Sequence, residues 1–224
     1  MTVIKDNHLK LYYEKIGQGP DLVMLHGNGE DHTTLMTLAF ALKSDFTIYL
    51  IDSRGHGQST GGIAKDYQEM SIDFIEFLNQ QKIYKTSVLG YSDGAIIALK
   101  SAVMQPDRFD KLILCGLNIS PDGLIDDIIK DMKCAYEKNK DPKLALMLEG
   151  PVFKPFDLEK VNHEVLLIFG ENDLIKKQHQ ADITTQLSHA SLYILKGETH
   201  SSYIMDNVML VPLVMAFLKP TKSS

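Results

Sequence analysis

Cysteine is scarce in this sequence: only Cys115 and Cys134 occur among 224 residues. Two thiols are too few for the disulfide framework of a small secreted domain or for a four-thiolate zinc site. One lies in a strand-like run and the other in a helix-like run. We therefore expect both to be reduced residues in or near the core.

Long apolar runs and an excess of positive charge are also missing. No stretch of about 18 apolar residues occurs, and residues 1–15 alternate polar and apolar side chains instead of forming a basic leader with an apolar run. The formal net charge of −6 opposes binding to phosphate backbones and anionic lipid. These absences predict a cytoplasmic protein whose partner is neither nucleic acid nor a membrane.

Cofactor motifs are incomplete. Residues 27–29 and 55–57 each begin like a dinucleotide-binding loop, but His32 and Thr60 stand where the third glycine is required. No Gly-Lys-Ser or Gly-Lys-Thr occurs to hold a phosphate. The sequence therefore predicts no cofactor.

Histidines and carboxylates gather near both loops, at His26, Glu30, Asp31, His32 and His56. None belongs to a helical His-x-x-x-His pair or has a cysteine partner, the patterns that suit zinc. We expect hydrogen-bonding loop residues here and no metal. The later histidines His163, His179 and His189 are expected to face solvent.

Short apolar runs alternate with helix-like stretches along the chain. Near-continuous Val, Ile and Leu runs are typical of strands buried on both faces. They occupy residues 22–25, 46–51, 86–89, 112–115, 165–169 and 192–195. Residues 3–5 and 9–14 predict two more strands, joined by a possible hairpin across Asp6-Asn7. Helical spacing covers residues 33–43, 67–81, 93–104, 178–188 and 203–218.

This alternation predicts an α/β fold with a mostly parallel, eight-stranded sheet and helices on both faces. The length suits one domain over residues 1–224. Residues 117–163 break the alternation and contain two helix-like pieces, which predicts a short helical lid. Its apolar residues either line an acyl pocket or simply pack on the domain: Leu124, Ile128, Met132, Met147, Leu148 and Phe153.

The strongest local motif is Gly90-Tyr91-Ser92-Asp93-Gly94, which stands between a strand-like run and a helical run. Small residues two before and two after the serine allow a sharp strand-to-helix turn with strained backbone, and the turn exposes the hydroxyl at a helix N-terminus. Partial positive charge there favours an oxyanion. Ser92 is therefore the candidate nucleophile.

Acyl transfer also requires two backbone N–H donors aimed at the oxyanion. Asp93, directly after the nucleophile, would supply one. The loop at residues 26–29 follows the strand at residues 22–25 and would supply the other, best placed at Asn28.

A serine nucleophile needs a base, and the base needs an orienting carboxylate. His200 follows the last strand-like run, and Asp173 follows the run before it. Active-site groups of parallel sheets gather beyond the carboxyl ends of the strands, so Ser92, Asp173 and His200 can converge. Glu171 lies in the same loop and is an alternative acid.

Together these motifs resemble the α/β-hydrolase superfamily from residue 9 to about residue 218. The order Ser92, Asp173, His200 is the one described for that fold. Residues 52–59, Asp-Ser-Arg-Gly-His-Gly-Gln-Ser, look like the superfamily's Arg-Gly-x-Gly-x-Ser turn, and the spacing of Gly170 and Asp173 matches its acid loop. Haloalkane dehalogenases and epoxide hydrolases on this scaffold have Asp at the nucleophile position of this turn, the nucleophile elbow. The sequence, with Ser92 there, more closely resembles the serine branch of small esterases, enol-lactonases and carbon-carbon bond hydrolases.

The resemblance implies a serine hydrolase that cleaves a small carboxylic ester or similar acyl bond through an acyl-enzyme. Acyl transfer or carbon-carbon cleavage with the same three residues is an alternative. A ligand-binding receptor on a hydrolase scaffold is another, although such proteins often have a degraded triad. Asp93 departs from the pattern, since many members have an uncharged residue at that position.

Overall fold

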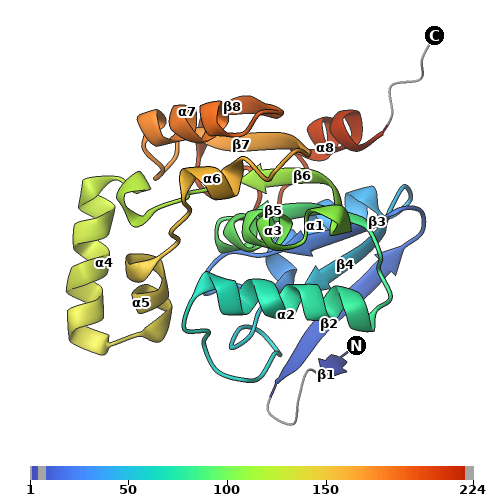
Figure 1. Ribbon diagram of the computed structural model, residues 1–224, viewed down its shortest axis with the longest axis horizontal. Helices are drawn as coiled ribbons and strands as arrows, with labels where there is room; N and C mark the ends of the chain where they lie inside the picture. The colour runs from blue at the N-terminus through green and yellow to red at the C-terminus, as the bar shows by residue number, and fades with distance from the viewer. Residues whose placement is uncertain (1, 5–8, 220–224) are drawn as a thin grey trace.

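The computed structural model describes residues 2–4 and 9–219, which form a sheet covered by helices on both faces (Figure 1). The strands are β1 (Thr2–Ile4), β2 (Lys10–Gly17), β3 (Asp21–Leu25), β4 (Thr47–Ile51), β5 (Thr86–Tyr91), β6 (Phe109–Cys115), β7 (Glu164–Asn172) and β8 (Ala190–Thr199). Their order is β1-β2-β4-β3-β5-β6-β7-β8. The strands β3 to β8 pair in parallel, whereas β2 runs antiparallel to β1 and β4. The predicted eight-stranded, mostly parallel sheet is confirmed.

The N-terminal pair β1 and β2 is antiparallel and lies at one edge, as predicted. The turn expected across Asp6-Asn7 lies outside the described residues.

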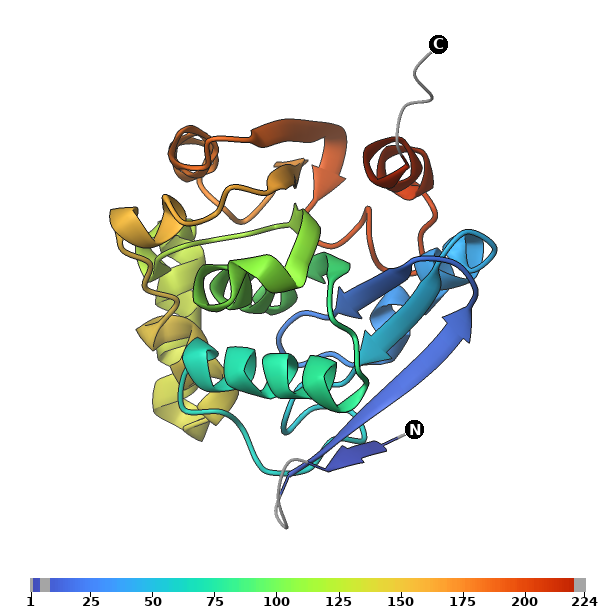
Figure 2. The same ribbon diagram turned by 45° about the vertical axis from the view of Figure 1, so that its right-hand side comes forward.

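Two helical layers cover the sheet. Helices α1 (Met36–Leu42) and α8 (Val211–Leu218) lie on one face, and α2 (Tyr67–Gln80), α3 (Asp93–Met104) and α7 (Lys177–Gln186) on the other (Figure 2). Short 3-10 turns occupy His32–Leu35, Pro106–Arg108 and Pro121–Gly123. Strand residues alternate between the layers: Leu112 and Leu114 pack with α2 and α3, whereas Ile113 and Cys115 pack with α1 and α8. This double burial explains the near-continuous apolar runs.

The helix predicted over residues 203–218 is shorter than expected. Tyr203 and Ile204 are buried, which accounts for their helix-like apolar spacing, but they belong to a turn. Asp206 takes a φ of 47°, and the Asn207 side chain accepts a hydrogen bond from the Met209 N–H. Such local side-chain bonds favour turns over helix, so α8 begins only at Val211.

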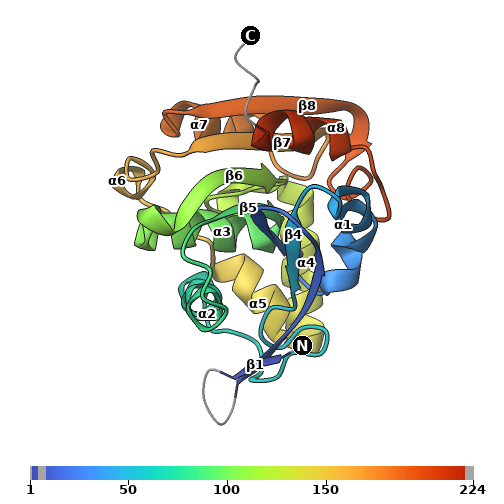
Figure 3. The same cartoon turned by 90° about the vertical axis from the view of Figure 1, so that its right-hand side faces the viewer.

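Between β6 and β7 the chain forms α4 (Asp126–Asn139), α5 (Pro142–Glu149) and the short α6 (Pro155–Leu158). The two helix-like pieces of the predicted lid are thus confirmed as helices. The segment is tied to the chain after β7, because the Ile125 N–H donates to the Leu174 carbonyl at 2.9 Å and the Lys176 N–H to the Gly123 carbonyl at 2.8 Å. Figure 1 shows α4 and α5 to one side of the strands, and in Figure 3 they lie on the side away from the viewer.

The cysteines differ in environment. Cys115 is buried in β6, as expected, but Cys134 is exposed on α4. Only Met132 of α4 is buried, so the expectation of a position in or near the core is wrong for Cys134. In the described part of the chain, no helix is long and apolar enough to cross a bilayer.

Candidate active site

Ser92 stands at the junction of β5 and α3 with φ 52° and ψ −116°. A non-glycine residue at positive φ is uncommon and stores backbone strain. The flanking glycines are required by space: a Cβ on Gly90 would lie 2.3 Å from the Gly94 carbonyl oxygen, and one on Gly94 would lie 2.1 Å from that of Leu25. Strand and helix therefore approach as closely as the elbow motif predicts.

The structure brings Ser92, His200 and Asp173 together. His200 Nδ1 lies 2.7 Å from Asp173 Oδ1, and His200 Nε2 lies 3.1 Å from Ser92 Oγ. Both oxygens of the buried Asp173 also accept backbone N–H bonds, from Gly170 and Ile175. Asp173 is therefore an acceptor, which places the imidazole proton on Nδ1 and leaves Nε2 free to accept the Ser92 hydroxyl proton.

The alternative acid, Glu171, lies elsewhere. It is exposed, and its Oε2 accepts a hydrogen bond from the Gly197 N–H at 2.9 Å. Of the two carboxylates in this loop, Asp173 is the one in contact with His200.

Two residues that the sequence analysis did not assign shape the slot for His200. A Cβ on Gly116, at φ +61°, would lie 2.5 Å from His200 Cε1, so no larger side chain fits beside the ring. The Tyr91 ring packs against the His200 imidazole, with the two ring centroids 5.3 Å apart. The only sequence signal for Gly116 is a glycine directly after the β6 run.

The two expected oxyanion donors lie on the same cavity as Ser92. Asp93 is the first residue of α3, where backbone N–H groups have no partner within the helix. Among the described residues, neither the Asn28 nor the Asp93 backbone N–H donates to a protein acceptor. Both amides are thus available to a bound oxygen.

The cavity has a volume of about 300 Å³. Of the six apolar residues considered for a pocket in the predicted lid, Leu124 and Met147 line the cavity, whereas Ile128, Met132, Leu148 and Phe153 pack on the core. Among the residues that the structure describes, no lysine or arginine lines it, but Glu30 and Asp93 do. The cavity is lined by: Gly27, Asn28, Glu30, Tyr67, Tyr91, Ser92, Asp93, Asn118, Leu124, Met147, Gly150, Leu174, Ile175, His200, Ser201 and Met205.

The Asp93 carboxylate is buried, with only 3% of the residue exposed. The Tyr67 hydroxyl donates to its Oδ1 at 2.8 Å, and the Asn28 side-chain amide to its Oδ2 at 2.9 Å. Burial raises the pKa of Asp93 to about 6, although these two hydrogen bonds act in the opposite direction. Burial also raises the pKa of the neighbouring Glu30.

Behind the cavity, Asp52 joins the loops that follow β3 and β4. Its Oδ1 accepts from the backbone N–H and Nδ1 of His32, at 2.7 and 2.8 Å, and its Oδ2 from the Gln58 N–H at 2.8 Å. Ligand atoms of Asp31, His32 and Asp52 lie within 4.8 Å of one another. Since protein donors occupy both Asp52 oxygens, the geometry fits a hydrogen-bonded scaffold better than a metal site.

His26 is a neutral ring at the start of residues 26–29, the loop expected to supply an oxyanion donor (the oxyanion loop). Its Nε2 accepts from the Ser53 N–H at 3.0 Å, and its Nδ1 lies 2.7 Å from the Gly27 carbonyl oxygen. Burial lowers the pKa of His26 to about 4. The ring therefore stays uncharged at neutral pH.

The raised pKa of Asp93 predicts a pH-dependent stability. Between the pKa of about 3.8 in the unfolded chain and about 6 in the folded protein, only the folded state holds the proton, so raising the pH disfavours folding. Asp93→Asn removes this titration, whereas His26 titrates in both proteins. Relative to Asp93→Asn, the wild type should lose about 2 kcal/mol of unfolding free energy between pH 4 and pH 7. Urea unfolding at several pH values measures the difference, and a pH-independent difference would contradict the assignment.

The sequence is similar to those of several known proteins. A family model described as serine aminopeptidase, S33, matches residues 20–200. A pimeloyl-[acyl-carrier protein] methyl ester esterase of Vibrio parahaemolyticus is 30% identical, over 88% of this chain and 93% of that protein. An abhydrolase domain-containing protein of Schizosaccharomyces pombe is 33% identical, but that match spans 47% of this chain and 42% of the relative's length.

Among solved structures, an esterase from Exiguobacterium antarcticum superposes with a TM-score of 0.83 at 18% identity, covering 95% of this chain and 96% of that one. At this identity the likeness concerns the fold, which is the α/β-hydrolase fold. The family match covers most of the chain, including Ser92, Asp173 and His200. The chain therefore belongs to the serine aminopeptidase S33 family of the α/β-hydrolase superfamily and to the hydrolase class of enzymes.

Proposed function

We propose that the protein hydrolyses a small carboxylic ester or similar acyl bond, with Ser92 as nucleophile, His200 as base and Asp173 as orienting acid. The observation that carries the proposal is the hydrogen-bonded chain from Asp173 through His200 to the Ser92 hydroxyl. These hydrogen bonds end at Ser92, which lies on a strained turn at a helix N-terminus, the context that serine nucleophiles of this fold require. The similarity to a methyl ester esterase supports the choice of an ester.

Acylation follows from the contacts. Ser92 Oγ attacks the carbonyl carbon while its proton passes to His200 Nε2. Negative charge develops on the carbonyl oxygen, where the backbone N–H groups of Asn28 and Asp93 stabilise it. The bond to the leaving alcohol then breaks, and His200 gives its proton to the alcohol oxygen.

Deacylation repeats these steps with water. His200 Nε2 takes a proton from water as the water oxygen bonds to the acyl carbon. The bond to Ser92 Oγ then breaks, Oγ regains the proton, and a carboxylic acid leaves. Asp173 keeps its charge and holds His200 in one tautomer throughout. No cofactor takes part in either half.

The cavity supports a small, uncharged acyl substrate. Its volume of about 300 Å³ is at the low end for ligand pockets. Leu124 and Met147 from the segment between β6 and β7 line it, which supports a lid role for residues 117–163. Glu30 and Asp93 make it unfavourable for an anionic acyl group. That the protein acts in the cytoplasm stays a prediction from the sequence.

Removing the nucleophile or its acid should abolish most of the turnover. By analogy with a measured Ser-His-Asp triad, we expect Ser92→Ala to lower kcat about 10⁶-fold and Asp173→Ala about 10⁴-fold. Matched controls are Ser201→Ala, a second serine on the cavity, and Glu171→Gln, the second acid of the loop. Both controls should stay close to wild type in a nitrophenyl butyrate assay. Near-wild-type turnover by Ser92→Ala would show the proposed nucleophile to be wrong.

Cavity size and charge predict substrate preference. Among nitrophenyl esters of increasing acyl length, kcat/KM should be highest for acetate or butyrate and fall at octanoate. A hemisuccinate, which adds a terminal carboxylate, should be at least about tenfold poorer than butyrate because it meets Glu30 and Asp93. Highest activity on octanoate, or on the hemisuccinate, would contradict this account of the cavity.

A further inference from the structure

The proposed reaction uses only the backbone of Asp93 and Asn28, yet their side chains form a hydrogen-bonded chain with Tyr67. The Tyr67 hydroxyl donates to one oxygen of Asp93, and the Asn28 amide donates to the other, at 2.8 and 2.9 Å. Tyr67 and Asp93 are each 3% exposed. This chain connects the first residue of α2, the first residue of α3 and the oxyanion loop.

The rest of the oxyanion loop is anchored before Asn28. His26 is held by the Ser53 N–H, and the Gly27 N–H donates to Glu30 at 3.1 Å. After Asn28 comes Gly29, at φ +75° with open space around it. In the part of the chain that the structure describes, the Asn28 side chain donates only to Asp93 and, at 3.3 Å, to the Lys143 carbonyl on α5. The Glu30 N–H closes a turn around Asn28 by donating to the Gly27 carbonyl at 3.4 Å, and the Asn28 side chain ties that turn to α3 and α5.

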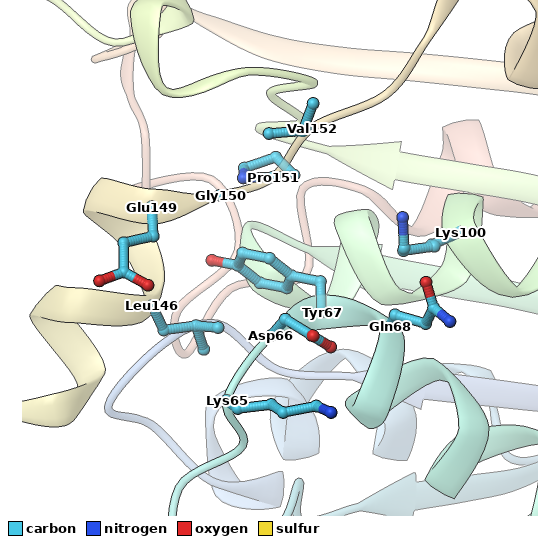
Figure 4. Close-up of a pocket in the computed structure, with 10 residues that line it drawn as sticks. All are labelled: Lys65, Asp66, Tyr67, Gln68, Lys100, Leu146, Glu149, Gly150, Pro151 and Val152. Carbon is cyan, nitrogen blue, oxygen red and sulfur yellow. The ribbon is translucent and has the colours of Figure 1, made fainter.

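Tyr67 is itself fixed by the end of α5. Figure 4 shows its ring beside Gly150 and Pro151, with the hydroxyl directed toward α5. A Cβ on Gly150 would lie 3.2 Å from Tyr67 Cδ2, so the ring and this backbone are in close contact. The ring also separates two cavities, because Tyr67 and Gly150 line both the cavity at Ser92 and a second one of about 320 Å³. The carboxylate thus receives a donor whose direction is set by packing.

An uncharged apolar residue at position 93 would supply the same backbone N–H but no acceptor for Asn28. The carboxylate has a disadvantage, since its charge lies near a developing oxyanion and near Glu30. Its two donors offset part of that charge, and His200 is the nearby group of opposite sign when protonated. Any advantage of the Asp93 carboxylate for catalysis must then come through the Asn28 side chain, which it holds.

We propose that Asp93 is a positioning residue whose carboxylate, directed by the Tyr67 hydroxyl, holds the Asn28 side chain and so fixes the second oxyanion donor. This inference rests on the proposed serine hydrolase function. It assigns to Asp93 a role distinct from that of its backbone N–H. The bond from Asn28 to the Lys143 carbonyl extends the same support to α5.

The test exchanges the two side chains. Asn28→Asp removes the amide that donates to Asp93 and places a second carboxyl group against it, which should displace the loop. We expect kcat to fall about 100-fold, the effect of losing one oxyanion donor, while KM changes less than about threefold. Adding Asp93→Asn restores a donor and an acceptor with their roles exchanged. The double variant should regain at least about tenfold in kcat over Asn28→Asp.

Two further variants keep the test decisive. Asn28→Ala removes the side chain but keeps the backbone N–H, and should lower kcat at least about tenfold. Asp73→Asn is the matched control: it alters another buried acid, paired with Arg54, and should lower Tm but leave kcat within about twofold. Circular dichroism and thermal unfolding establish that each variant is folded.

The outcomes separate the two proposals. If Ser92→Ala is as active as wild type, the proposed function is wrong. If Ser92→Ala is inactive but the double variant regains less than tenfold, or Asn28→Ala keeps kcat within threefold, only the positioning role is overturned. A loss of kcat in Asp73→Asn equal to that in Asn28→Asp would assign the effect to general destabilisation and would also overturn it.

Discussion

The backbone turn at Ser92 brings β5, α3 and β3 closer together than any side chain would allow at two positions. The Gly94 position leaves no space for a Cβ against the Leu25 carbonyl, and Gly90 leaves none against Gly94. Strain of this kind costs on the order of 1 to 3 kcal/mol and persists only where surrounding packing imposes it. Here the buried sheet on one side and α3 on the other impose it, and the Ser92 hydroxyl is held out into the cavity as a result.

Buried polar groups then fix the loops around that turn. Asp52 joins two loops through both of its oxygens, and His26 bridges the chain at Ser53 and Gly27. Such networks stabilise only when every buried donor and acceptor is satisfied. Asp93 follows the same rule, since both of its oxygens accept a hydrogen bond. The site is therefore a set of loop ends held by carboxylates and a neutral histidine.

Much of this arrangement follows from local sequence patterns. The apolar runs predict the strands because burial on both faces leaves a continuous signal, and the elbow motif predicts the turn at Ser92 because only glycine fits on either side. Asp173 and His200 could be chosen because each follows a strand at the same edge of the sheet. The helical spacing of residues 203–218 does not show that α8 begins only at Val211. The residues before it form a turn, in which the Asn207 side chain accepts a hydrogen bond from the Met209 N–H.

Sequence patterns could not predict contacts between segments that are distant along the chain. His179, expected to face solvent, is half-buried and accepts a hydrogen bond from the Ile119 N–H at 3.1 Å. Gly116 is needed only because His200, far along the chain, lies against it. The chain from Tyr67 through Asp93 to Asn28 joins three separate segments, so neither its existence nor its effect on Asp93 follows from spacing.

The proposed function requires His200 and Asp173 to activate the Ser92 hydroxyl. Covalent labelling with a fluorophosphonate, followed by mass spectrometry of the intact protein and its peptides, measures that activation. We expect one adduct per chain, located on Ser92, and much slower labelling after His200→Ala. An adduct on another residue, or no adduct on the folded wild-type protein, would contradict the account.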